Sequence, residues 1–370
     1  MKVKTIGRFL VIGCILALLI VGCGVTVSIN SKANATPTQS IEAKMTQLAM
    51  VQPTLAQAAK VQPTITQAAP ALPAMKEYTH PSNSFSMSVP VDWTIPTELS
   101  GYVFLASPDK NAFVGLYAEN TGNALDAETF TKAINAFEFN TFSSIKNYKE
   151  VTRDVQADKG YAIIVKNLDM NAVPYNAATI YEQKGKALYI QIYMSAASAA
   201  SQSGPILTAM KDSFKSYPAS AESLSPFTSS LISYTDPDNL FSLSVSALWT
   251  KNDSNKDGLN IGYYPPDGNA VITLYKADLG KTVTRALADS YVLNLLKSAY
   301  RDMIVSKTEV LKNGSIQKTW APKAGGFQAV IIYKWSGTTL FMLSWLVDTG
   351  FENIYGPVFN QSIASYQIPQ

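Results

Sequence analysis

One stretch of this sequence occurs twice, and that repeat constrains the fold more than any other feature. The sixteen residues from Tyr78 to Trp93 align without a gap on Tyr234 to Trp249, and nine of the sixteen are identical. The segments Tyr175 to Tyr193 and Phe327 to Trp345 also align without a gap. Self-similarity at this spacing indicates one domain present in two copies.

The repeat sets the predicted domain boundaries. We place the first domain at residues 78–219 and the second at residues 232–370, with a serine-rich connection at residues 220–231. Domains of this length can each bury a core.

Matching turns and helices recur in both copies. Pro108–Ala112 and Pro266–Ala270 each separate two apolar runs, and Pro with Asn or Gly favours a tight hairpin turn. Asp126 can cap a helix with an apolar stripe. The stripe residues are Phe130, Ile134 and Phe137 in the first copy and Leu287, Tyr291 and Leu295 in the second. A closing amphipathic segment ends at Ser216-Tyr217 and again at Ser365-Tyr366.

This order of elements predicts the fold class. Each copy reads as a hairpin, a strand, a helix, a four-stranded meander and a closing helix. Strands adjacent in sequence form antiparallel sheets on which helices pack. We therefore expect an α+β protein with two tandem α/β/α sandwich domains, each a mainly antiparallel sheet flanked by helices.

The first residues have the features of an export signal. Met1–Arg8 contains three positive charges, and an apolar stretch follows from Phe9 to Val21. The residues from Ile20 to Cys23 resemble a bacterial lipobox, which predicts a signal peptide over residues 1–23 and a lipid on Cys23. An uncleaved membrane helix is the alternative, because Phe9–Ile29 has no charge and about 20 residues cross a bilayer. Soluble secretion is a third interpretation.

Residues 24–77 predict a spacer. The decapeptide 51–60 is repeated almost unchanged at 61–70, and Pro53 and Pro63 break any long helix. Either form of anchor would hold the two domains outside the cytoplasm and away from a membrane surface.

Composition excludes several classes of function. Thirty Lys and Arg oppose 27 Asp and Glu, and no basic run is present, so nucleic acid is not an expected partner. Both cysteines, Cys14 and Cys23, precede the domains, and His80 is the only histidine. A zinc site built on Cys and His, or a Ser–His–Asp triad repeated in both copies, is therefore excluded. We expect no cofactor.

The opening strand of each copy carries a family resemblance. Phe85-Ser-Met-Ser-Val-Pro90 followed by Trp93 is similar to the first strand of the PsbP/DcrB-like superfamily, and the second copy departs from it by having Ser246 at the position of Pro90. The resemblance implies an α/β/α sandwich around an antiparallel sheet and a non-enzymatic accessory, assembly or binding role. It supplies no catalytic residues.

Several residues are candidates for a site. If exposed together, the aromatic residues of the second domain would form a ligand-binding face: Trp320, Trp335, Trp345, Tyr263 and Tyr264. Trp93 and Trp249, at equivalent places, are expected in the cores. Asp253, Asn255 and Asp257 match the first half of a calcium loop, but Tyr264 stands where its bidentate Glu is required. His80, before a proline, is expected in a turn.

These features predict a membrane-tethered, extracytoplasmic accessory protein that is not an enzyme and that binds or positions another component of the cell envelope. We expect that component to be a protein. A lipoprotein that captures a small ligand or polymer in an aromatic-lined cleft is the alternative. A carboxylate-dependent hydrolase is a second alternative.

Overall fold

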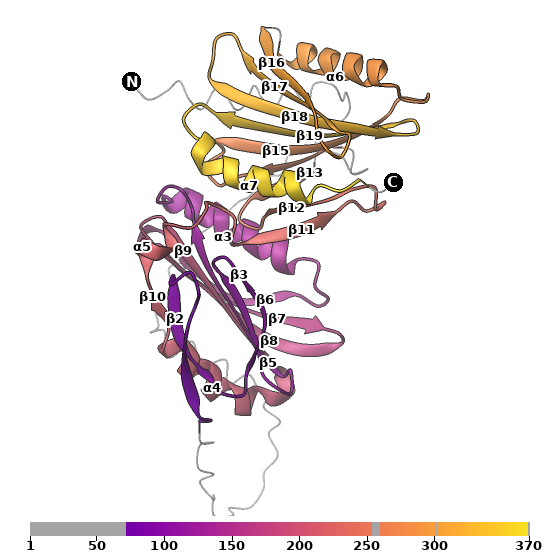
Figure 1. Cartoon of the computed structure of the whole chain (residues 1–370). Helices are drawn as coiled ribbons and strands as arrows, with labels where there is room; N and C mark the ends of the chain where they lie inside the picture. The colour runs from indigo at the N-terminus through magenta and orange to yellow at the C-terminus, as the bar shows by residue number, and fades with distance from the viewer. Residues whose placement is uncertain (1–71, 254–259, 301, 369–370) are drawn as a thin grey trace, which may run out of the picture.

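The computed structural model describes residues 72–253, 260–300 and 302–368, and two antiparallel sheets dominate it (Figure 1). The strands of the first sheet are β3 (Thr94–Leu99), β4 (Tyr102–Ala106), β5 (Ala112–Asn120), β6 (Lys149–Gln156), β7 (Tyr161–Met170), β8 (Val173–Lys184) and β9 (Ala187–Ala196). Those of the second are β13 (Thr250–Asp253), β14 (Asn260–Tyr264), β15 (Ala270–Asp278), β16 (Met303–Val310), β17 (Ile316–Pro322), β18 (Phe327–Ser336) and β19 (Thr339–Asp348).

The second sheet repeats the topology of the first. The strand orders are β3-β4-β5-β9-β8-β7-β6 and β13-β14-β15-β19-β18-β17-β16. The predicted α+β class, with two sandwich-like domains, is confirmed. The edge strands β3 and β13 were not foreseen; β3 is exposed along its whole length, so its sequence lacks the apolar alternation of a half-buried strand.

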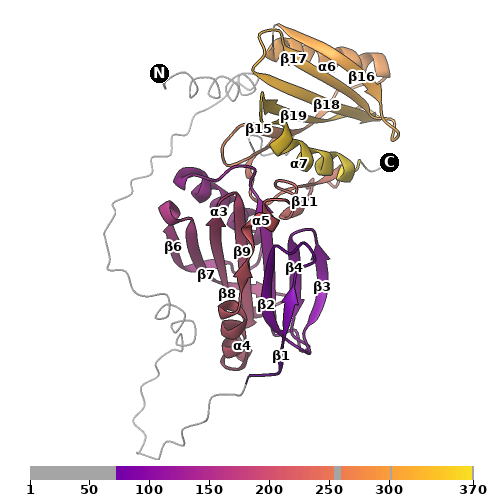
Figure 2. The same cartoon turned by 60° about the vertical axis from the view of Figure 1, so that its left-hand side comes forward.

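A hairpin and a helix cover one face of each sheet (Figure 2). They are β1 (Met75–Thr79), β2 (Phe85–Pro90) and α4 (Ala200–Asp212) in the first sandwich, where β10 (Lys215–Ser216) also pairs with β2. In the second they are β11 (Leu231–Thr235), β12 (Ser242–Ser246) and α7 (Glu352–Ser365). Short helical turns occur at η1 (Ala157–Lys159), η2 (Ala197–Ala199) and α5 (Pro218–Ala221). Among the described residues, every helix is too short or too polar to cross a bilayer.

The other face carries α3 (Ala127–Phe142) or α6 (Arg285–Ala299). Asp126 caps α3 as predicted, accepting a 2.8 Å hydrogen bond from the amide of Thr129. The stripe Phe130, Ile134 and Phe137 is buried. In α6 the predicted stripe is wrong by one residue: Ala288, Val292 and Leu296 are buried, while Leu287, Tyr291 and Leu295 are only half-buried.

The closing helices match in a different register from the one predicted. Ser213 Oγ accepts a hydrogen bond from the amide of Ser88, and Ser365 Oγ accepts one from the amide of Ser244. Because Ser88 and Ser244 are equivalent in the repeat, Ser213-Phe214 corresponds to Ser365-Tyr366. The predicted match with Ser216-Tyr217 is therefore wrong by three residues.

The two sandwiches share one core. The cluster of buried side chains beneath α3 continues into the second domain, where it includes Trp249 and Tyr355. Phe227, from the segment between the domains, lies 5.5 Å from the ring of Tyr355 and 6.2 Å from that of Trp249. Figures 1 and 2 show α3 at the end of the first sandwich that meets α7. The connection is thus part of the packed interior.

Candidate functional site

The last two residues of β5 hold the segment that joins the domains. Asn120 Nδ2 donates to the carbonyls of Glu222 and Leu224, both at 2.8 Å. The carboxylate of Glu119 accepts from the backbone amides of Ser229 at 3.3 Å and Ser230 at 2.8 Å. These bonds fix the path of the chain into the second sandwich.

Glu119 is an acid buried away from solvent, with 0% of its surface exposed. Burial raises its pKa to about 7, and the hydrogen bonds from Ser230, Ser229 and Thr228 offset part of that rise. The second copy has Ala277 at the equivalent position of the sheet, where it pairs with Leu340 as Glu119 pairs with Leu188. The buried carboxylate therefore belongs to the joint and not to the repeated scaffold.

A second buried polar cluster ties α3 to its sheet. Lys166 Nζ donates to both oxygens of Glu138, at 2.6 and 2.5 Å, and to Thr179 Oγ1 at 2.7 Å. The Tyr181 hydroxyl donates to Glu138 Oε1 at 2.8 Å, and Lys166 Nζ lies 3.6 Å from the centre of the Phe142 ring. Burial lowers the pKa of Lys166 to about 8, although the pair with Glu138 favours its charged form.

The second sandwich contains a cluster of the same kind, built differently. Lys318 Nζ lies 3.4 Å from Asp289 Oδ1, and the Tyr333 hydroxyl donates to the same oxygen. Tyr333 is equivalent to Tyr181, but Leu296 stands at the position of Glu138, so the carboxylate comes from an earlier turn of the helix. Sequence analysis missed both clusters. The available signal was a lysine in β7 and in β17 that alternates with apolar residues on the buried face of the strand.

A groove of about 250 Å³ lies beside α4 on the face of the first sheet. Its lining comes from β7, β8, β9 and the end of α4, and includes Tyr161, Ile163, Ile180, Glu182, Gln191 and Lys211. Phe214, after α4, completes the wall. The groove thus combines an apolar floor and aromatic side chains with one buried amide and charged side chains.

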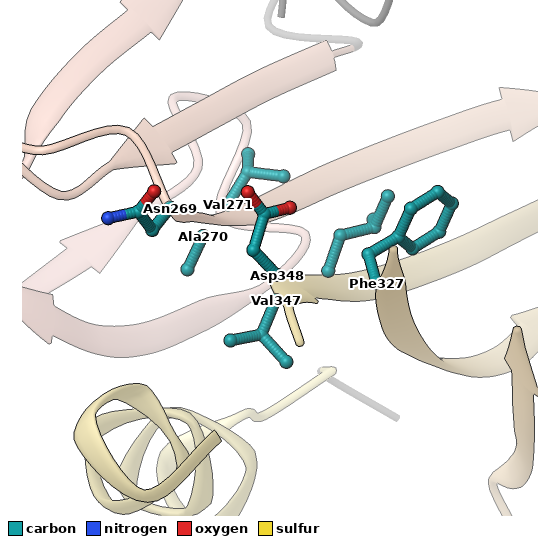
Figure 3. Close-up of a pocket in the computed structure, with 7 residues that line it drawn as sticks. Asn269, Ala270, Val271, Phe327, Val347 and Asp348 are labelled. Atoms are coloured by element: carbon teal, nitrogen blue, oxygen red, sulfur yellow. The ribbon is translucent and has the colours of Figure 1, made fainter. Parts of the chain in front are cut away.

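A much smaller pocket in the second sandwich holds about 20 Å³, which is room for about one water molecule. Figure 3 shows Asp348 and Asn269 beside the apolar side chains of Val271 and Phe327. Its size makes it a hydration site at most.

The predicted aromatic face is not assembled. Trp320 and the half-buried Trp335 pack in the core beneath α6, whereas Trp345 and Tyr263 are buried in the cluster on the opposite face of the sheet. Tyr264 is half-buried. Because the strand period of two sends these side chains to opposite faces, they cannot line one cleft. Trp93 and Trp249 lie in the cores as predicted.

His80 lies in the turn that sequence analysis predicted. Its Nδ1 lies 2.7 Å from Ser82 Oγ, and its carbonyl accepts from the amide of Asn83. Asn255 and Asp257 of the calcium candidate lie outside the described residues, as does Cys23. In the part of the chain that the structure describes, no group of three or more His, Cys, Asp or Glu could hold a metal.

Comparisons with known proteins give distant similarities only. No family model matches the sequence, and no curated protein does. Among solved structures, the chain is similar to PsbP (CyanoP) of a Synechocystis species, with a TM-score of 0.30, 9% identity and coverage of 44% of this chain and 99% of that one. The chain is also similar to LpqN of Mycobacterium tuberculosis, which is involved in cell envelope biogenesis. The TM-score is 0.25 and the identity 11%, and the match covers 38% of this chain and 90% of LpqN.

A crystal structure from Bacteroides thetaiotaomicron gives a TM-score of 0.27 and 12% identity over 38% of this chain. The match spans about half of that protein, 48% of its length. Similarities of this size do not establish a family or a function for the chain.

Proposed function

We propose that this protein is a non-catalytic accessory protein of the cell envelope whose two sandwiches bind and position another envelope protein. The observation that carries the proposal is where its unusual acids and bases lie. Glu119, Lys166 and Tyr181 have strongly shifted pKa values, yet each is 0% exposed. Acid–base catalysis needs such groups within hydrogen-bond reach of a substrate, so these serve the scaffold.

The shared core supports a positioning role. Two sandwiches joined through packed side chains, and not through a flexible linker, present their surfaces at a fixed spacing. Preorganisation of that kind lowers the entropy lost on binding a partner.

Tethering to a membrane is the second part of the proposal. It rests on the charged and apolar N-terminal segment, the Ile20 to Cys23 motif and the spacer. Metabolic labelling with a fatty acid should mark the wild-type chain and not a Cys23→Ala variant. If the wild type is not labelled and the variant migrates with the same mobility, the lipid anchor is ruled out, and the membrane helix and soluble secretion remain.

The binding role is tested by photo-crosslinking in cells. A photoreactive amino acid is placed in turn at five exposed positions and at one half-buried position beside the groove. It should give a discrete adduct with one envelope protein from neighbouring positions. The exposed positions are Leu99, Phe139, Val151, Ile304 and Val310, and the half-buried one is Phe214. The proposal fails if, at every position, the irradiated sample shows only the diffuse background that is also seen without irradiation.

A further inference from the structure

The groove beside α4 contains a polar group that the fold does not require. Gln191, on β9, is only 5% exposed, and its Oε1 accepts a 2.7 Å hydrogen bond from the Tyr193 hydroxyl. That bond uses the oxygen and orients the amide, which leaves the two N–H groups of Nε2 for another acceptor.

The equivalent position in the second sandwich shows that the fold does not require a polar side chain there. There Leu343 replaces Gln191, and it is buried in the core. The groove's other polar positions differ too, since Lys334 replaces Glu182 and Ile363 replaces Lys211. Ile180 and Phe214 are kept in kind, as Ile332 and Tyr366, but Gln317 pairs with Ile332 where Ile163 pairs with Ile180. The twin sandwich therefore folds with an apolar side chain in place of this amide.

The charged side chains at the rim of the groove form ion pairs with neighbouring side chains of the same domain. Glu182 pairs with Lys184 at 3.0 Å, and Lys211 pairs with Asp212. Neither charge is left to attract a ligand by Coulomb forces alone. Recognition in the groove therefore depends on apolar fit and on a hydrogen bond to the Gln191 amide.

The shape of the surface selects the kind of occupant. A volume of about 250 Å³ is below the ~300–1,000 Å³ of pockets that enclose most of a small molecule. Three edge strands, β3, β6 and β16, contain register irregularities that hinder pairing with a strand of another protein. A groove that is too small for a whole ligand can hold one large side chain of a protein, with the surrounding surface completing the contact.

We propose that this groove is an anchor pocket for one large apolar side chain of a partner polypeptide, whose adjacent backbone carbonyl accepts a hydrogen bond from Gln191 Nε2. The inference rests on the proposed function and specifies the chemistry of the partner: a neutral segment with an exposed Trp, Phe or Leu.

The test uses N-acetyl-L-tryptophan amide as a capped mimic of such a residue, titrated into the full chain and followed by NMR. The proposal expects saturable shifts at Ile163, Ile180 and the Gln191 side-chain amide. The variant Gln191→Leu, which installs the twin's residue, should weaken binding by about tenfold or more. Lys334→Glu, at the position equivalent to Glu182 in the second sandwich, is the control and should leave binding unchanged. Raising salt from about 50 to about 500 mM should alter the affinity less than about twofold.

Three outcomes would overturn the proposal: shifts that do not saturate, equal binding to Gln191→Leu, or free tryptophan binding about tenfold more tightly than the capped form. The last would identify a free zwitterion as the ligand. A groove that fails these tests while the photo-crosslinked adduct persists refutes the pocket alone. Loss of the adduct at every position refutes the proposed function.

Discussion

The carboxylate of Glu119, at the end of β5, accepts a 2.8 Å hydrogen bond from the backbone amide of Ser230, in the segment leading into the second sandwich. One buried acid therefore bridges the two repeats, and it titrates near neutral pH.

The stability of the folded protein should depend on pH through Glu119. Its pKa is about 7 when folded and 4.5 ordinarily, so between these values the folded protein holds a proton that the unfolded chain has released. The free energy of unfolding should therefore fall as pH rises from about 4.5 to about 7, by about 3 kcal/mol for this group.

Urea unfolding across that range, for the wild type and Glu119→Gln, measures this contribution. The free energy of unfolding of the variant should not show the decrease with pH that Glu119 causes. His80, whose pKa burial lowers, contributes a slope of opposite sign below its usual pKa in both proteins, so it cancels in the difference. Parallel pH profiles would contradict the role given to Glu119.

A side chain at Gly101 should disturb the joint. Gly101 has a φ of +76°, and a Cβ there would lie 2.2 Å from Ser229 Oγ and 2.6 Å from the Ala118 carbonyl oxygen. Gly268 has nearly the same φ, +74°, but open space around it. Gly101→Ala should therefore lower the unfolding free energy by about 2 kcal/mol more than Gly268→Ala. Equal losses would mean that only backbone strain matters at Gly101.

Removing one partner of the Lys166–Glu138 pair should cost more than removing both. Glu138→Leu alone leaves a buried lysine without its counter-charge and should destabilise by about 3–5 kcal/mol. The double variant Glu138→Leu with Lys166→Met should recover much of that loss, because Leu296 already occupies the equivalent helix position in the twin. Denaturant unfolding of the two single variants and the double variant measures the coupling. Additive losses would show that the pair does not act as a unit.

Truncating Phe227 should weaken both sandwiches together. Phe227→Ala removes a ring that is 1% exposed between Trp249 and Tyr355, at a cost of about 3–5 kcal/mol. Phe139→Ala, at a ring that is 58% exposed, is the control and should change little. Tryptophan fluorescence and circular dichroism should report one shared loss. Destabilisation confined to the second sandwich would contradict a common core.

Periodicity and repeated turn residues were enough to predict the sandwiches, because those signals record which face of each element is buried. The same signals gave the wrong buried face for α6. Ala288 is buried but only weakly hydrophobic, so the larger Leu287 beside it was assigned to the buried face, and the predicted stripe is shifted by one residue. They also failed for the aromatic residues of the second domain, since counting Trp and Tyr does not reveal which face of a sheet each one occupies. A lysine among the apolar residues of β7 indicates that it needs a partner. That this partner is Glu138, and that Glu119 holds the joint, depends on contacts between distant segments, which no local pattern encodes.

The common core also bears on how such a chain can change over generations. While two copies remain separate, either can be lost and the other survives as an independent domain. Once Phe227 and α3 seal one copy against Trp249 and Tyr355 of the other, deleting either copy uncovers apolar surface on the survivor. Loss of one copy would therefore destabilise the other, and each repeat is part of the environment in which the other is selected.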